Sequence, residues 1–335
     1  MYLPKLKLIL QLGLVFLSIF VVYRVWQAFD LNQRYQRFSQ AIFSLQSTQV
    51  KPVPTPKSPY RYPPIKELLL RELTSTWNLK DTYALRACSL DGLVFANNST
   101  QAKNQTGWLQ LQYQLDLING LFDCLQRREL DPALELKISD LLRHKRSQLP
   151  IYWNNFLVTE PALINQWQVS GLRYDKQRYY SKFPIDSLAV LSALKTYVLS
   201  AELPIAYNET SVLQTLYTLD GKAYLSPLIS DLQLALIWLP TLNNQLKQVT
   251  NCPSSKQDLI YGILSRYFTQ GTQLELARLD TALNQVISPL QRIYFETTHE
   301  AQITQLIRQK NQLHGFLKVH VQQWQRLISL CDGKK

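Results

Sequence analysis

Residues 108–125, WLQLQYQLDLINGLFDCL, carry the strongest periodic signal in the chain. Apolar side chains recur there in alternating steps of three and four, at Trp108, Leu111, Leu115, Ile118, Phe122 and Leu125. Such spacing places them along one face of a helix. The stretch therefore predicts an amphipathic helix that packs lengthwise against a neighbouring helix.

The segment before this helix carries the first of four cysteines, Cys88, Cys124, Cys252 and Cys331. Asp81 can cap a helix that includes Cys88, and Gly107 is suited to end it, so we expect an antiparallel hairpin that turns near residue 106. None of the cysteines has a metal-type spacing, and an even number in an exported domain predicts two disulfides. Three connectivities are open. We favour Cys88–Cys124 and Cys252–Cys331, because each pair then joins neighbouring helices.

The rest of the chain also reads as helical, and we predict an all-α, bundle-like domain over residues 65–331, with 65–150 and 184–331 as its two halves. Expected helices cover 30–45, 65–73, 131–149, a short stretch from 161, 184–200, 209–219, 223–249 with kinks at Pro227 and Pro240, and 255–286 with a break near Pro289. The final helix, 300–330, is expected to bury Leu306, Leu313, Leu317, Val321, Trp324 and Ile328.

The N-terminal end contains the longest apolar run, LILQLGLVFLSIFVVY at 8–23. A helix over residues 6–26 would be about 31 Å long, enough to span a bilayer. We therefore predict an uncleaved membrane anchor over residues 6–26, preceded by a cytoplasmic tail of residues 1–5. A cleaved signal peptide and a buried or surface helix are the alternatives; bulky residues where small ones are needed disfavour cleavage. The apolar stretch 225–242 contains two prolines and an aspartate and reads as a buried core helix.

Between the anchor and the domain, an amphipathic helix is expected within residues 27–48. Residues 49–64 contain six prolines, which prevent a helix and favour an extended linker or a strap across the domain. The anchor places the chain in a bacterial inner membrane, with its C-terminal domain in the periplasm.

Composition fits this location. The chain has 335 residues, 46% of them hydrophobic, only 10 glycines and a net charge of +12. Behind a membrane anchor, the available polyanions are phospholipid headgroups and cell-wall polymers, and nucleic acid is not expected as a partner. A solvated basic surface that binds nothing in particular is the alternative.

Motifs for known chemistry are almost absent, so we expect no catalytic residue, cofactor or metal. The spacing of the glycines excludes dinucleotide and P-loop motifs, and His314 and His320, six residues apart, lie on different helix faces. One S-x-x-K match, Ser192 to Lys195, resembles the motif of penicillin-binding enzymes but lacks a K-T-G partner, and we interpret it as a solvated helix face.

One basic segment is a candidate ligand surface, with a surface loop whose tyrosines cover the edge of the core as the alternative. One loop interleaves basic and aromatic residues, a composition that suits sugars and anions: Arg173, Tyr174, Lys176, Arg178, Tyr179, Tyr180 and Lys182. The run Arg143-His144-Lys145-Arg146 falls at the end of a predicted helix, where cations interact favourably with the dipole.

Several segments in order resemble a known family: YQRFSQAI, the Pro-rich stretch, ALRACSLDGLVFANNS, LQLQYQLDLINGLFDCL and HKRSQLPIYWNNF. They are similar to the uncharacterised Gram-negative envelope family catalogued as domain of unknown function 3080, over roughly residues 31–280. Many members look like lipoproteins, whereas this chain has no lipobox cysteine. The resemblance implies an envelope location and supplies no activity.

We therefore expect a membrane-anchored envelope protein that binds or scaffolds without catalysis, with an envelope protein or an anionic polymer as its partner. An enzyme acting on cell-wall or lipid substrates is the main alternative, and a basic polyanion binder is the other.

Overall fold

The computed structural model describes residues 31–45, 62–73, 84–97, 107–127, 130–168, 184–200, 202–221 and 223–332. The regular elements in these ranges are all helices, and the ranges contain no strand, which confirms the all-α class. The elements are α2 (Leu31–Phe43), α3 (Ile65–Leu68), the 3₁₀ turn η1 (Leu85–Cys88), α5 (Asp91–Asn97), α6 (Trp108–Leu125), α7 (Pro132–Ser147), α8 (Leu149–Thr159), α9 (Pro161–Trp167), α11 (Ile185–Val198), α12 (Glu209–Asp220), α13 (Leu225–Gln248), η3 (Ser254–Lys256), α14 (Gln257–Ile263), the π-helix η4 (Leu264–Thr272), α15 (Gln273–Tyr294) and α16 (Glu300–Asp332).

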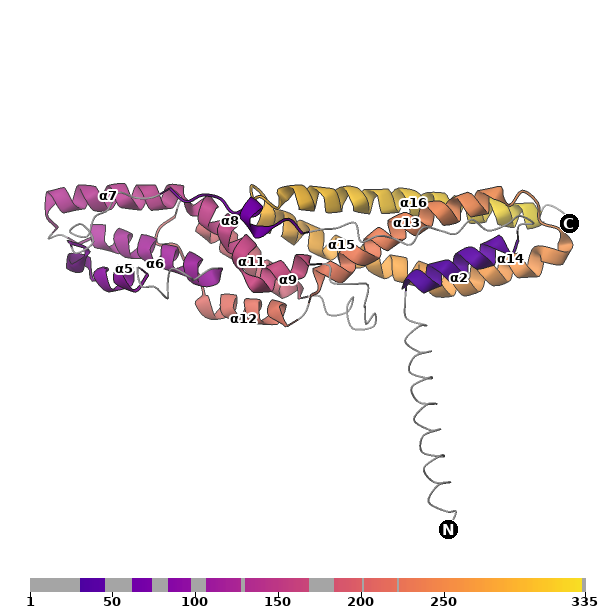
Figure 1. Ribbon diagram of the computed structural model, residues 1–335, viewed down its shortest axis with the longest axis horizontal. Coiled ribbons are helices and arrows are strands. Elements are labelled where there is room, and N and C mark those ends of the chain that lie inside the picture. Colours follow the sequence, from indigo (N-terminus) through magenta and orange to yellow (C-terminus); the bar gives the residue numbers. More distant parts are fainter. Residues whose placement is uncertain are drawn as a thin grey trace, which may run out of the picture.

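The molecule is elongated (Figure 1). Helices α5, α6 and α7 form one end, α2, α13, α14 and α16 form the other, and α8, α9, α11 and α12 lie between them. The buried apolar side chains nevertheless form one cluster that runs from Leu31 to Cys331.

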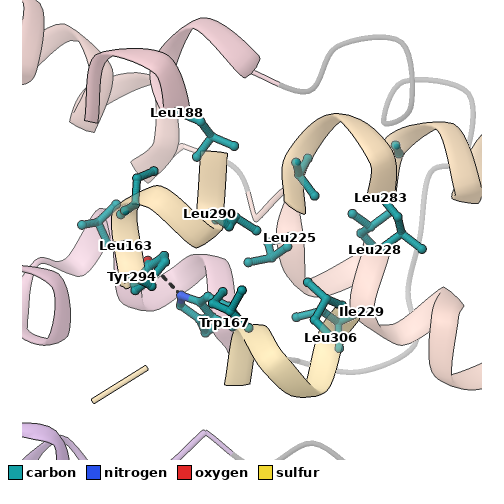
Figure 2. Close-up of a cluster of buried hydrophobic side chains, with 14 of the residues drawn as sticks. Leu163, Trp167, Leu188, Leu225, Leu228, Ile229, Leu283, Leu290, Tyr294 and Leu306 are labelled. Atoms are coloured by element: carbon teal, nitrogen blue, oxygen red, sulfur yellow. Dashed lines mark hydrogen bonds between the residues drawn. The ribbon is translucent and has the colours of Figure 1, made fainter. Parts of the chain in front are cut away.

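The middle of this core joins α9, α11, α13, α15 and α16 (Figure 2). Leu163 and Trp167 from α9 meet Leu225 from α13 and Tyr294 from α15 within one apolar cluster. The Trp167 indole N–H donates to the Tyr294 hydroxyl over 3.0 Å, so the polar atoms of both rings are satisfied inside the core. This packing holds the two ends of the molecule in one body.

Helix α6 has the predicted bounds, and its buried face is close to the predicted one. Leu111, Leu115 and Ile118 are at most 1% exposed, but toward the C-terminus Leu121 and Cys124 replace the expected Phe122 and Leu125. The shift follows from the helical repeat of 3.6 residues, which drifts from a strict heptad. The helix packs against α7 and α8 as well as α5.

The expected helix through Cys88 is wrong. Ser89 adopts a left-handed conformation (φ 61°), which ends η1 at Cys88, and the next helix, α5, begins at Asp91 and is only seven residues long. Gly107 (φ 64°) precedes the first residue of α6 instead of ending a helix, and its N–H donates to the Thr159 hydroxyl. The predicted pairing holds: Cys88 and Cys124 form a disulfide with a Cα–Cα distance of 5.3 Å.

The expected helix over 65–73 is also too long. Helix α3 stops at Leu68, because Leu69 is extended (φ −69°, ψ 131°). Residues 69–73 form no helix, and their backbone is bound by the side chains of Gln148, just before α8, and of Asn155 in α8. Helix α8 itself was not predicted.

At the other end, α16 packs along α13 and α15, and α2 packs on α13. The second disulfide, Cys252–Cys331, has a Cα–Cα distance of 5.0 Å and joins the end of α16 to the segment after α13.

Helix α15 continues through Pro289 to Tyr294, so the expected break is wrong. Pro227 lies in the first turn of α13, where proline is tolerated, and Pro240 lies inside that helix.

The residues of the predicted anchor, 6–26, and most of the Pro-rich segment 49–64 lie outside the described residues. Within the described part of the chain, one helix is long and apolar enough to cross a membrane, α13, and 67% of its most apolar window is buried inside the protein. It is the core helix that the sequence predicts, and the N-terminal anchor stays a prediction.

Candidate functional site

An open groove lies where α7, α8 and α11 converge, and we call it the arginine groove. It has a volume of about 670 Å³ and is lined by Ser139, Leu142, Arg143, Arg146, Ser147, Leu149, Pro150, Leu199, Ser200 and Glu296. This volume falls within the range of small-molecule sites. Leucines from three elements and a proline supply apolar surface, and two arginines supply positive charge.

Helix α7 places both arginines in the groove because they are three residues apart, on one face of its last turns. Asp131 caps the start of α7 by accepting from the Leu134 N–H, and Pro132 follows at the first helical position, as predicted. Arg143 pairs with Asp140 one turn earlier, and its side chain remains 74% exposed. A guanidinium held in this way stays available to a ligand.

The other two residues of the basic run face elsewhere. Lys145 is half-buried, donates to the Tyr152 hydroxyl over 3.1 Å and has its pKa lowered by burial. The His144 ring lies beside Gln148, with 2.6 Å between their Nε2 atoms. The run is in the last turn of α7, as predicted, and the structure further divides it between the groove and the protein interior.

The lining favours binding over acid–base chemistry. The hydroxyls of Ser147 and Ser200 donate to the carbonyls of His144 and Tyr197, each three residues earlier in the chain. Glu296, in a left-handed conformation (φ 57°), is the only carboxylate among the lining residues, and its N–H donates to Glu300. Guanidinium groups remain protonated at all physiological pH values and bind carboxylate or phosphate in a fixed fork.

The S-x-x-K match lies beside the groove but is not the solvated face that we expected. Ser192 and Lys195 are 7% and 8% exposed, because α11 packs against α8, α12 and α15. The Lys195 ammonium donates to the carbonyl of Phe295 over 2.5 Å, at the C-terminal end of α15, where a cation is favourable. Burial lowers the pKa of Lys195. This contact gives the lysine a structural role.

Two histidines are fully buried elsewhere. His320 lies between Asn243 and Trp324, and His299 lies against Tyr62, with 2.9 Å from its Nε2 to the tyrosine hydroxyl. Burial lowers the pKa of each to about 4. His314 instead pairs with Asp280 on the surface, which confirms that His314 and His320 occupy different faces. Among the described residues, no group of three or more His, Cys, Asp or Glu side chains could hold a metal ion.

The loop that the sequence singled out as a ligand surface, with Arg173, Tyr174, Lys176, Arg178, Tyr179 and Tyr180, lies outside the described residues. Its role stays a prediction. The sequence did not indicate the arginine groove, since the run Arg143–Arg146 is separated by some fifty residues from Leu199 and by more from Glu296.

Comparison with known families gives one result. Residues 35–334 match the family described as protein of unknown function (DUF3080). The chain belongs to the DUF3080 family. The match extends through α16, beyond residue 280 where the sequence resemblance was expected to end, so the whole helical domain is the DUF3080 unit. No curated protein and no solved structure matches the chain.

Proposed function

We propose that this DUF3080 chain is a non-enzymatic binding protein of the bacterial envelope, anchored by residues 6–26, which holds an anionic ligand with an apolar part in the arginine groove. One observation carries this proposal: Arg143 and Arg146 lie at the same groove as an apolar surface made by Leu142, Leu149 and Leu199. The arginines suit a carboxylate or phosphate, and the leucines suit a hydrocarbon chain.

The location supports this choice of ligand. Residues 6–26 and the two disulfides fit a chain exposed to an oxidising compartment outside the inner membrane. Anionic amphiphiles, such as phospholipids and fatty acids, are abundant there. Catalysis on such molecules is the less favoured function, because the groove offers guanidinium groups and hydroxyls that already donate to backbone carbonyls.

The test is binding of a fluorescent anionic amphiphile, dansyl-undecanoic acid, to the full chain in mild detergent, followed by fluorescence. Arg143→Ala with Arg146→Ala removes two charge-assisted contacts, and we expect binding at least about tenfold weaker, since each such contact contributes roughly 1.5 kcal/mol or more. The control is Arg308→Ala with Lys318→Ala on the exposed side of α16, which removes the same charge.

The proposal requires the control to bind like the wild type. Equal weakening in both double variants would show that the probe responds only to net charge, and unchanged binding in the groove variant would rule out the groove as its site.

A further inference from the structure

The arginine groove has a charged group on a second wall, the carboxylate of Glu296. Arg143 and Arg146 belong to α7, which packs on α6 and α8, whereas Glu296 follows α15, which packs on α11, α13 and α16. Helices α7 and α15 lie on opposite sides of α8 and α11 along the molecule (Figure 1). The groove therefore receives positive charge from one element and negative charge from another.

Glu296 has an unusual backbone conformation for a glutamate. Its φ is 57°, in the left-handed region that glycine and asparagine adopt most readily. The surrounding turn holds this conformation, since the Glu296 N–H donates to the Glu300 carboxylate over 2.9 Å. The hydroxyl and the N–H of Thr297 both donate to the Tyr294 carbonyl. Residues held in such a conformation by a well-bonded turn cluster at ligand sites, so a glutamate here indicates a role for its carboxylate.

The Glu296 carboxylate is exposed and is not neutralised by the groove arginines. In the described part of the chain, Arg143 pairs with Asp140, and neither arginine forms an ion pair with Glu296. The charge of Glu296 also acts on the Lys195 ammonium, but that ammonium is buried and donates to the Phe295 carbonyl. The carboxylate thus remains open to a cationic group of a ligand.

The charges at the groove match a zwitterion. Two guanidinium groups are balanced by the carboxylates of Asp140 and Glu296, so a ligand with both signs of charge complements the groove better than a simple anion does. An ammonium suits Glu296 better than a hydroxyl does, because hydrogen bonds between two ionised groups are the stronger ones.

From this arrangement we infer that the ligand of the arginine groove is an aminophospholipid of the phosphatidylethanolamine class. Its phosphate binds Arg143 and Arg146, its ammonium donates to Glu296, and its acyl chain lies on the groove leucines. The inference rests on the proposed function, and it adds Glu296 as the residue that selects the headgroup.

The test is a competition on the full chain in mild detergent, in which lipids displace dansyl-undecanoic acid. Short-chain phosphatidylethanolamine is compared with its N-acetyl derivative, which has the same phosphate and acyl chains but a neutral amide in place of the ammonium. For the wild type, we expect the N-acetyl lipid to bind at least about tenfold more weakly, because it lacks one charge-assisted contact.

A third competitor separates the lipid from its free headgroup. Free phosphoethanolamine carries the same two charges without the acyl chains, and it is expected to displace the probe only weakly. Displacement at the same concentration as the lipid would overturn the assignment to a lipid.

The matched variants are Glu296→Gln and, as a control, Glu209→Gln at the exposed start of α12. Glu296→Gln keeps the length of the side chain and removes its charge, so we expect it to bind the two lipids with nearly equal affinity. The control is expected to keep the preference of the wild type. Equal binding of the two lipids by the wild type, or a preference that survives in Glu296→Gln, would overturn the inference.

The arginine variant tells this failure apart from a failure of the proposed function. If Arg143→Ala with Arg146→Ala still binds the probe like the wild type, the groove is not the site and both proposals fail. If that variant loses the probe while the wild type does not distinguish the two lipids, the inference alone fails.

Discussion

The buried His320 makes the stability of the domain dependent on pH. Its Nδ1 lies 2.7 Å from the amide oxygen of Asn243, which requires a proton on Nδ1, and its Nε2 accepts from the indole N–H of Trp324 over 3.1 Å. The ring is therefore neutral, with a lone pair on Nε2. A second proton would place two N–H donors against each other in the core.

The size of the effect follows from the pKa. Burial lowers the pKa of His320 to about 4, against 6.5 in the unfolded chain. The unfolded state therefore binds more protons as the pH falls below 6.5, and stability is lost between about pH 6.5 and 4. Between pH 7 and pH 5 this single group accounts for about 2 kcal/mol of the free energy of unfolding.

The assay is urea unfolding of the full chain in mild detergent at pH 7 and pH 5, for the wild type and for His320→Gln, which cannot titrate. The variant is less stable at pH 7, but its loss between the two pH values is expected to be about 2 kcal/mol smaller. An equal pH dependence in the wild type and in His320→Gln would refute the reasoning.

Two further predictions concern stability at neutral pH. Replacing Cys252 and Cys331 by serine opens a closure of 79 residues, and the chain-entropy relation predicts a loss of about 4.5 kcal/mol, measured by urea unfolding under non-reducing conditions; a loss below about 1 kcal/mol would contradict it. Leu115→Ala, on the buried face of α6, is expected to lower the free energy of unfolding by about 3 kcal/mol. Leu109→Ala is the control, because Leu109 is 52% exposed on the same helix, and it is expected to lower it by less than about 0.5 kcal/mol. Equal melting temperatures for the two variants would show that the buried face of α6 is misassigned.

Helices with one apolar face could be predicted from the sequence, and those buried on several sides could not. In α6 the stripe identified the helix and the first two-thirds of its buried face, up to Ile118. In α8, Tyr152, Trp153, Asn154 and the stretch Phe156–Val158 are all buried, so the helix has no polar face to reveal its period.

Buried polar residues caused a second kind of error. Along α16, Leu306, Leu313 and Trp324 are buried as predicted. Leu317, Val321 and Ile328 were also expected to face the core, but they are only partly buried or exposed, and the structure buries His320 and Leu327 instead. The sequence periodicity did not indicate the π-helix η4, which contains Phe268. The centroid of the Phe268 ring lies 4.8 Å from the centroid of the His320 ring. A histidine that packs like an aromatic residue is not counted in an apolar stripe.

Both disulfides were predicted correctly, although only one cysteine of each pair lies in an α-helix: Cys124 in α6 bonds to Cys88 in the turn η1, and Cys331 in α16 bonds to Cys252 after α13. The arginine groove could not be predicted. It depends on Leu199 and Glu296 lying beside α7, and this placement is a product of tertiary packing.

The most direct test of the arginine groove is to locate a bound ligand. A photoreactive fatty acid with a benzophenone on its chain is added to the full chain in mild detergent, irradiated, and the labelled peptides are identified by mass spectrometry. We predict labelling of residues 139–150 and 199–200, lost in the Arg143→Ala, Arg146→Ala variant and retained in the Arg308→Ala, Lys318→Ala control. Labelling confined to α13 or α16, or unchanged in the groove variant, would contradict the proposed function.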